Sequence, residues 1–350
     1  MRSSSLISSV IAAACYNYFA SAVVLDTEGL PDSGLNTSSW VAGVKPPLAD
    51  IFNLHDMQLA VKNYLGETQY AYIRTGSLDE HTYHANLDIW KHIKLRPHQS
   101  HGRNVANVST EQTLLGTKFS VPFFIAPAGY SSFTDPENGE LNLVRGAGNQ
   151  GALYVPSILS SKTTAEMAAA RLSNQTLFRQ ASFSITDSGT YSTDRSLQSA
   201  AELQKLTKLP IVPKGIISWQ DAKMCLDLGF KAVYISNHGG RLIDTAPTAV
   251  EILLDIHKNA PEVINSMEVY ADGGVRHGSD IVKLLALGVK GIGIGRSAVF
   301  SNAWGVEGVE RFFSLLKREL ITTMMLLGVT EISQLDRSYI NTKAVENMMF

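Results

Sequence analysis

The chain has 350 residues, of which 45% are hydrophobic and 18% are charged, a composition typical of a folded globular protein. Its 30 lysine and arginine residues against 32 aspartate and glutamate residues give a formal net charge of -2, which argues against a nucleic-acid partner. The length suffices for one large α/β core and not for two full domains beside it. No stretch reaches the about 20 apolar residues that a helix needs to span a bilayer, so we expect no membrane span.

The first residues have the features of a secretory signal peptide. Arg2 precedes a moderately apolar segment at residues 6–19, and Ala20-Ser21-Ala22 supplies the small side chains that favour cleavage. We expect a signal peptide at residues 1–22 and a secreted protein. Because polar residues interrupt the apolar segment, a disordered or transit-type leader is the alternative. Three glycosylation sequons support export, and they begin at Asn36, Asn107 and Asn174.

Residues 23–50 lack periodicity and are rich in serine, proline, glycine and aspartate, so we expect an extended arm or linker there. The rest of the chain, residues 51–350, is predicted to form one domain. Apolar spacing predicts helices at residues 53–65 and 68–73. Strands and helices then alternate, as is typical of a parallel sheet with crossover helices. The predicted strands are residues 123–128, 152–157, 176–182, 210–215, 232–236, 267–271 and 291–295, and the predicted helices are residues 139–150, 163–171, 197–206, 218–228, 248–259 and 278–287.

A histidine and an arginine stand three positions apart at the end of the predicted strand at residues 232–236. They belong to the run Ser236-Asn237-His238-Gly239-Gly240-Arg241. A neutral histidine accepts a proton near neutral pH, and an arginine fork holds a carboxylate in a bidentate pose. The pair therefore suits the deprotonation of a small 2-hydroxy acid. For an isolated motif of this kind, a structural histidine at a strand end is the alternative.

Two glycine-rich turns further along the chain predict a phosphate cradle. Each follows a short apolar run and carries one arginine, in Asp272-Gly273-Gly274-Val275-Arg276 and in Gly295-Arg296. Glycine backbone N–H groups and helix N-termini bind anions, and the two guanidinium groups supply positive charge. Either turn alone is weak evidence, because glycine-rich turns are common.

In combination, these motifs resemble those of the FMN-dependent 2-hydroxy acid dehydrogenase and oxidase family, which includes glycolate oxidase, lactate oxidase and the flavin domain of flavocytochrome b2. The resemblance runs from about Asn53 to Tyr339. It implies a TIM-type (β/α)8 barrel of the α/β class, with FMN at the C-terminal ends of the strands. It also implies a small 2-hydroxy acid as substrate, no metal, and a homo-oligomer, since relatives are often tetramers.

The resemblance assigns roles to individual residues. It makes His238 the base that removes the α-proton or the hydroxyl proton, while Arg241 and Tyr72 hold the substrate carboxylate and oxygen. It places Lys214 beside flavin N1, where an ammonium stabilises the negative charge of the reduced ring. The implied catalytic set is His238, Lys214, Tyr72 and Arg241. The implied cofactor-binding set is Pro127, Ala128, Gly129, Ser157, Gln180, Lys214, Ser236, Asp272, Gly273, Gly274, Val275, Arg276, Gly295 and Arg296.

The chain departs from the family pattern after the third predicted strand. A barrel of this type has about eight strands, whereas the sequence predicts one fewer. The interval from Ala181 to Leu209 has room for one helix, which is too little for the family's fourth β/α unit. That unit carries an aspartate that orients the histidine and a second substrate arginine in relatives. Either the barrel recloses around the gap, another segment fills it, or the sequence lacks an exon. Ser182 also stands where the family has a substrate tyrosine.

Three functional hypotheses follow. The first is the FMN-dependent oxidation of a small 2-hydroxy acid to the 2-oxo acid, with His238 as base and Arg241 as carboxylate clamp. The second is a non-catalytic flavin-binding relative, disabled by the loss of the fourth β/α unit. The third is an FMN barrel enzyme of another reaction type, such as an isomerase, which the spacing of His238 and Arg241 disfavours. We rank the first hypothesis highest.

Overall fold

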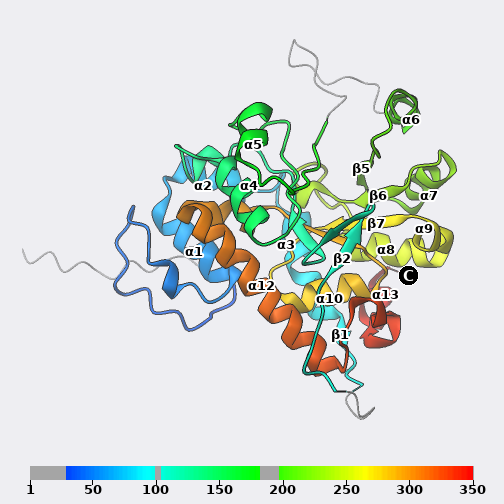
Figure 1. The fold of residues 1–350 in the computed structure, drawn as a ribbon. Coiled ribbons are helices and arrows are strands. Elements are labelled where there is room, and N and C mark those ends of the chain that lie inside the picture. Colours follow the sequence, from blue (N-terminus) through cyan, green and yellow to red (C-terminus); the bar gives the residue numbers. More distant parts are fainter. Residues whose placement is uncertain (1–28, 99–103, 182–196, 350) are drawn as a thin grey trace, which may run out of the picture.

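The computed structural model describes residues 29–98, 104–181 and 197–349, and the fold is given for these residues. The predicted signal peptide at residues 1–22 and Ser182 lie outside them. Helices and strands alternate along the chain, as the sequence predicts (Figure 1). The helices are α1 (Leu54–Tyr64), α2 (Glu67–Arg74), α3 (His81–Asp88), α4 (Glu140–Asn149), α5 (Thr164–Ala170), α6 (Leu197–Leu206), α7 (Trp219–Asp227), α8 (Ala249–Asn259), α9 (Pro261–Ser266), α10 (Gly278–Ala286), α11 (Arg296–Ser301), α12 (Gly305–Leu327) and α13 (Lys343–Met349). The strands are β1 (Lys94–Leu95), β2 (Gln112–Leu114), β3 (Thr117–Phe119), β4 (Phe123–Ile125), β5 (Lys214–Ile216), β6 (Ala232–Ile235), β7 (Glu268–Asp272), β8 (Gly291–Ile294) and β9 (Ile340–Asn341).

The central sheet is parallel. In the described residues it has the strand order β4-β8-β7-β6-β5. β4 pairs with β8 in a register that places Phe123 opposite Ile292. Beyond β4 the ladder continues through two isolated bridges, from Ile125 to Tyr154 and from Tyr154 to Leu177. The sheet and these two bridge positions curve around part of a barrel, whose helices lie outside it.

Most of the predicted strands are shorter in the structure than the sequence suggests, and the strand predicted at residues 123–128 is reduced to β4 at Phe123–Ile125. The strands predicted at residues 152–157 and 176–182 are reduced to the bridges at Tyr154 and Leu177. β5 begins at Lys214 rather than at residue 210, because Pro213 has no N–H to donate to the ladder. Gly215, with a φ of 96°, then shifts the register between β5 and β6. At β5 the prediction failed because a proline and a glycine interrupt backbone pairing.

The fourth β/α unit is not present in the described part of the chain. Between the bridge at Leu177 and β5, the described residues contain α6 and no strand. β5 pairs with β6 on one side and with no other described strand. Of the three alternatives that the sequence left open, reclosure of the barrel is not seen in the described residues, in which the sheet stays open.

Aromatic side chains from neighbouring strands pack together on the inner face of the sheet. Phe124 of β4, Tyr234 of β6 and Tyr270 of β7 meet edge to face, with ring centroids 5.8 to 6.2 Å apart. The hairpin formed by β2 and β3 packs against this cluster. Its Leu115 N–H donates to Glu268 at the start of β7, at 3.0 Å. The hairpin thus covers the N-terminal end of the sheet and leaves the C-terminal end for a site.

Residues 29–50 form an arm, and the 3-10 turn Leu48–Asp50 is the regular element in it. The arm is attached to the barrel by its own contacts. The Trp304 indole N–H donates to the Pro46 carbonyl at 2.8 Å, and Lys45 Nζ donates to the Ala303 carbonyl at 2.7 Å. Figure 1 shows α1, α4 and α12 on one side of the strands and α7, α8 and α9 on the other. None of the described helices is long and apolar enough to cross a membrane.

Candidate active site

A cavity at the C-terminal ends of the strands collects the predicted site residues. It encloses about 1160 Å³ of space, its open mouth included. Every predicted catalytic or cofactor-binding residue except Ser236 lines this cavity, and Ser236 bonds directly to two lining residues. The lining members are Tyr72, Pro127, Ala128, Gly129, Ser157, Gln180, Lys214, His238, Arg241, Asp272, Gly273, Gly274, Val275, Arg276, Gly295 and Arg296.

The turn after β7 lies directly against helix α3. Gly274 has a φ of 68°, and a Cβ added there would stand 1.9 Å from the Asn86 carbonyl oxygen. Both the conformation and the close approach require glycine at this position. The contact fixes the turn on α3, so that Gly273 and Arg276 line the cavity on a rigid support.

Arg276 carries a buried donor that the protein does not satisfy. Its side chain is buried, and Nη2 donates to Gln58 Oε1 at 3.2 Å. Nε is buried without a hydrogen-bond partner in the described structure. A buried, unpaired donor of a cationic group is costly unless an anion accepts from it. Arg276 therefore fits the anion-binding role that the sequence predicts.

Arg296 lines the cavity and also makes structural contacts. Its guanidinium donates to backbone carbonyls of Ile73 at 3.2 Å, Thr75 at 2.8 Å and Gly239 at 2.9 Å. Burial and the nearby charge of Arg241 lower the pKa of Arg296 to about 9. The side chain thus ties the end of α2 to the His238 loop, and its positive charge adds to a cationic environment that favours an anionic ligand.

Lys214, Ser236 and Asp272 form a polar cluster below the cavity. Lys214 Nζ donates to Ser236 Oγ at 2.9 Å and lies 3.4 Å from Asp272 Oδ2. The Ser236 hydroxyl donates to Asp272 Oδ1 at 2.7 Å. The start of β5 and the C-terminal ends of β6 and β7 therefore place a cation, a hydroxyl and an anion in one network.

His238 follows this cluster at the cavity mouth. Its backbone is in the left-handed region, with a φ of 57°. Burial among protein atoms and the charge of Lys214 lower the pKa of the imidazole to about 4, while the charge of Asp272 acts in the opposite direction. The imidazole is therefore neutral at pH 7, the form that accepts a proton. No described side chain hydrogen-bonds to its ring.

Arg241 and Tyr72 lie together on the other side of the mouth. Arg241 Nη2 donates to the carbonyls of Tyr72, at 2.8 Å, and of Ile73. The guanidinium carbon is 5.8 Å from the centre of the Tyr72 ring. Tyr72 packs edge to face on Tyr130 and Phe133, with centroids 5.4 and 5.1 Å apart. An aromatic wall thus stands beside the proposed carboxylate clamp.

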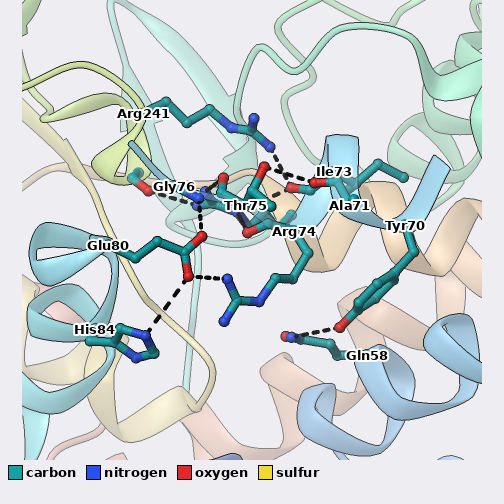
Figure 2. Close-up of polar contacts among 12 residues, drawn as sticks. Gln58, Tyr70, Ala71, Ile73, Arg74, Thr75, Gly76, Glu80, His84 and Arg241 are labelled. Carbon is teal, nitrogen blue, oxygen red and sulfur yellow. Dashed lines mark hydrogen bonds and ion pairs between the residues drawn. The ribbon is translucent and has the colours of Figure 1, made fainter. Parts of the chain in front are cut away.

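The end of α2 is held by a second set of contacts. Figure 2 shows Glu80 between Arg74 and His84, with Arg241 reaching toward Ile73. Glu80 accepts from the Gly76 N–H at 2.6 Å and pairs with Arg74, whose proximity lowers the pKa of the carboxyl. These contacts fix the position of the backbone carbonyls at the end of α2, to which Arg241 and Arg296 donate hydrogen bonds.

Several cavity residues were missed by the sequence analysis, among them Asn86 and Tyr83. Asn86 of α3 exchanges two side-chain hydrogen bonds with Asn237, at 2.9 and 3.0 Å. Tyr83 offers its ring to the guanidinium groups of Arg74 and Arg296, at 4.4 and 4.8 Å. Neither residue carries a local signal, because each acts through partners far away in the sequence.

The residues predicted to lie beside the flavin line one cavity, and their side chains bond mainly to backbone N–H groups. Gln180 Oε1 accepts from the Ile158 N–H at 3.1 Å, and Ser157 Oγ accepts from the Leu159 N–H at 3.1 Å. A Cβ added at Gly129 would lie 2.9 Å from Leu159 Cβ. These residues form the wall of the cavity opposite the glycine turns.

An α/β fold with a cationic cavity at the ends of its strands is typical of enzymes that bind a cofactor with a phosphate group. The sequence model of the FMN-dependent dehydrogenases matches residues 61–191 and 180–342. The chain therefore belongs to the FMN-dependent dehydrogenase family, whose cofactor is FMN. The two matched segments overlap at residues 180–191.

Individual relatives agree with this assignment. The chain is 28% identical over 367 residues to L-lactate dehydrogenase (cytochrome) of Wickerhamomyces anomalus, covering 87% of this chain and 64% of the relative. It is 28% identical over 359 residues to glycolate oxidase of Spinacia oleracea, covering 83% and 96%. The flavin-binding domain of baker's yeast flavocytochrome b2 superposes with a TM-score of 0.82 at 27% identity, covering 86% of this chain and 89% of that one. The chain thus spans less than two thirds of the Wickerhamomyces protein and nearly all of the spinach protein.

The residues present fit FMN. The unpaired Arg276 Nε and the glycine turn at Gly274 suit its phosphate. The turns at residues 273–276 and 295–296 would hold the phosphate. Lys214 and the wall formed by Pro127, Ala128, Gly129, Ser157 and Gln180 would face the ring.

Proposed function

We propose that this protein oxidises a small 2-hydroxy acid to the corresponding 2-oxo acid with FMN as cofactor. The observation that carries this proposal is the convergence of His238, Arg241, Tyr72 and Lys214 on one cavity. FMN, when bound, supplies a two-electron acceptor beside these groups. Membership of the FMN-dependent dehydrogenase family supports the general reaction.

His238 acts as the base in this proposal. Its pKa of about 4 keeps the imidazole unprotonated at neutral pH, so it can accept a proton from the substrate. The charge of Asp272 favours the imidazolium that results, whereas Lys214 opposes it. Proton transfer to His238 therefore depends on the balance of these two neighbouring charges.

Arg241 positions the substrate carboxylate. Nη2 is used by backbone carbonyls, and in the described part of the chain its Nε and Nη1 have no protein acceptor. Two N–H groups of one guanidinium suit a bidentate carboxylate pose. The Tyr72 hydroxyl stands on the same side of the cavity, where it can donate to the substrate oxygen.

The second candidate is a non-catalytic flavin-binding relative. Two observations favour it: the sheet is open in the described residues, and no described carboxylate bonds to the His238 ring. Such a protein would still hold FMN, because the phosphate turns after β7 and β8 are complete. The two candidates differ in whether a substrate reduces the bound cofactor.

Spectroscopy of the purified protein separates these candidates. We expect a yellow protein with flavin absorbance bands, which anaerobic addition of a 2-hydroxy acid bleaches. His238→Gln should retain the colour and lose the bleaching. Colour without bleaching in the parent protein would favour the non-catalytic relative. A folded protein that stays colourless with excess FMN would contradict both candidates, and a variant that reduces as fast as its parent would remove His238 as the base.

We also propose that the protein is exported and glycosylated. The sequon residues Asn36, Asn107 and Asn174 are all exposed, as glycan attachment requires. Expression in a eukaryotic secretory host should give a product whose mass falls on treatment with an N-glycosidase. Retention inside the cell, with no change of mass, would contradict the proposal.

A further inference from the structure

Ser236 is bonded to three groups of the candidate site. Its hydroxyl donates to Asp272 Oδ1 at 2.7 Å, accepts from Lys214 Nζ at 2.9 Å, and accepts from the His238 backbone N–H at 3.1 Å. A serine hydroxyl has one hydrogen to donate and two lone pairs. These three bonds therefore use its whole capacity, and they fix its orientation.

The third bond is made to a backbone in an uncommon conformation. His238 has a φ of 57°, a region that residues with a side chain seldom adopt without local support. The following turn is supported on its other side by Asn237, whose Oδ1 accepts from the Gly240 N–H at 3.2 Å. Ser236 and Asn237 thus hold the His238 loop from both ends, and Ser236 alone also contacts the charged pair.

We propose that Ser236 is a positioning residue, whose hydroxyl holds the His238 backbone and Lys214 in a fixed arrangement, and so sets the proton affinity of the His238 imidazole. This inference rests on the proposed role of His238 as the base. It goes beyond that role, because it assigns the control of the base to a side chain that does not line the cavity. Ser236 acts through Lys214 and through the loop, not on substrate.

The charges that face His238 come from four parts of the fold. Lys214 begins β5, Asp272 ends β7, Arg241 follows in the same loop, and Arg296 begins α11. Of these groups, Lys214 and Asp272 share the Ser236 hydroxyl. Without the hydroxyl, the Lys214 ammonium and the His238 N–H no longer share a hydrogen-bond acceptor. The imidazole and the ammonium are then no longer held in a fixed arrangement, so the charge of Lys214 lowers the pKa of the imidazole less.

Titration of the His238 ring by NMR tests the proposal without cofactor or turnover. The resonance is assigned by its loss in His238→Gln. In Ser236→Ala we expect the proton affinity of His238 to rise about tenfold or more, a change of about one pH unit or more in its midpoint. Ser236→Thr keeps the hydroxyl and should titrate like the parent. Ser301→Ala removes a buried hydroxyl that bonds to the Ala298 carbonyl away from the site, and serves as the control.

The role of Lys214 is tested by a double-variant cycle. If Ser236 acts by holding the ammonium, the effect of Ser236→Ala on the His238 titration should be much smaller in a Lys214→Met background. An equal effect in both backgrounds would overturn the proposal, as would an unchanged midpoint in a folded Ser236→Ala. If Ser236→Ala does not fold, Ser236→Cys replaces it with the same expectation and the same contradicting result. Because these readouts do not involve FMN or substrate, their failure is distinguishable from failure of the proposed oxidation.

Discussion

The approach of the Gly274 turn to α3 leads to a quantitative prediction for Gly274→Ala. The added Cβ would lie 1.9 Å from the Asn86 carbonyl oxygen, which is backbone and cannot rotate away. The positive φ of 68° costs an alanine about 1 kcal/mol. Forcing α3 and the turn apart adds about 1–3 kcal/mol, the usual range for overpacked sites. We therefore expect a loss of about 2–4 kcal/mol in the free energy of unfolding.

Gly229→Ala is the matched control for this variant. Gly229 ends the turn after α7 with a φ of 82°, and a Cβ there would have no atom within 4 Å. It should lose about 1 kcal/mol, from the conformational cost alone. Urea unfolding of both variants and the parent, followed by circular dichroism, gives the comparison. Equal losses in the two variants would refute the claim that contact with α3 makes glycine necessary at position 274.

The two variants should also differ in ligand binding. Displacing Asn86 disturbs its two hydrogen bonds to Asn237, the residue that supports the His238 loop. Gly274→Ala should therefore weaken FMN binding about tenfold or more, whereas Gly229→Ala should leave it unchanged. Quenching of FMN fluorescence on titration with protein measures both affinities.

Three further predictions concern buried or paired groups. Arg276→Met should weaken FMN binding about tenfold or more, because it removes the buried, unpaired Nε donor that suits an anion; unchanged affinity in a fluorescence titration would contradict this. The hydrogen bond to Glu319 raises the pKa of His277, so its contribution to stability is complete below about pH 6.5 and is lost as the pH rises through the raised value. Urea midpoints of Glu319→Gln should lack that part of the pH dependence, and parallel curves for parent and variant would refute it. Burial raises the pKa of the Cys225 thiol to about 12, so a thiol reagent at about pH 8 should label it only after unfolding; rapid labelling of the native protein would contradict this.

The sequence could predict those parts of the site whose chemistry is local. His238 and Arg241 lie in one turn, and the glycines that precede Arg276 follow a strand directly. Parallel strands end at the same edge of a sheet, so residues after successive strands meet in space. This rule brings the His238 loop near the glycine turns, whereas the place of Lys214 was implied only by the family resemblance. The helices between the strands could also be predicted, because each has apolar residues at helical spacing.

The sequence could not predict partners that come from distant elements. Asn86 reaches Asn237 only because α3 lies against the turn after β7. The use of Arg296 by carbonyls of α2 depends on the position of that helix relative to the barrel. The length of β5 was predicted wrongly for a different reason: Pro213 and Gly215 interrupt pairing within an otherwise apolar segment. Local pattern gives the type of an element, whereas its partners and its ends depend on packing.

The strand order explains why the described site residues converge on one cavity although the sheet is open. The phosphate turns, the His238 loop and Lys214 belong to β8, β7, β6 and β5, which are consecutive neighbours in the sheet. Each of these strands is paired to the next, so a break beyond β5 leaves their relative positions set by hydrogen bonds that remain. The wall at residues 127–129 follows β4, on the other side of β8. What the break removes is the support that a further strand would give to β5, and thus to Lys214 in particular. The bonds from Lys214 to Ser236 and Asp272 run toward β6 and β7, and they hold the ammonium from the side that is intact.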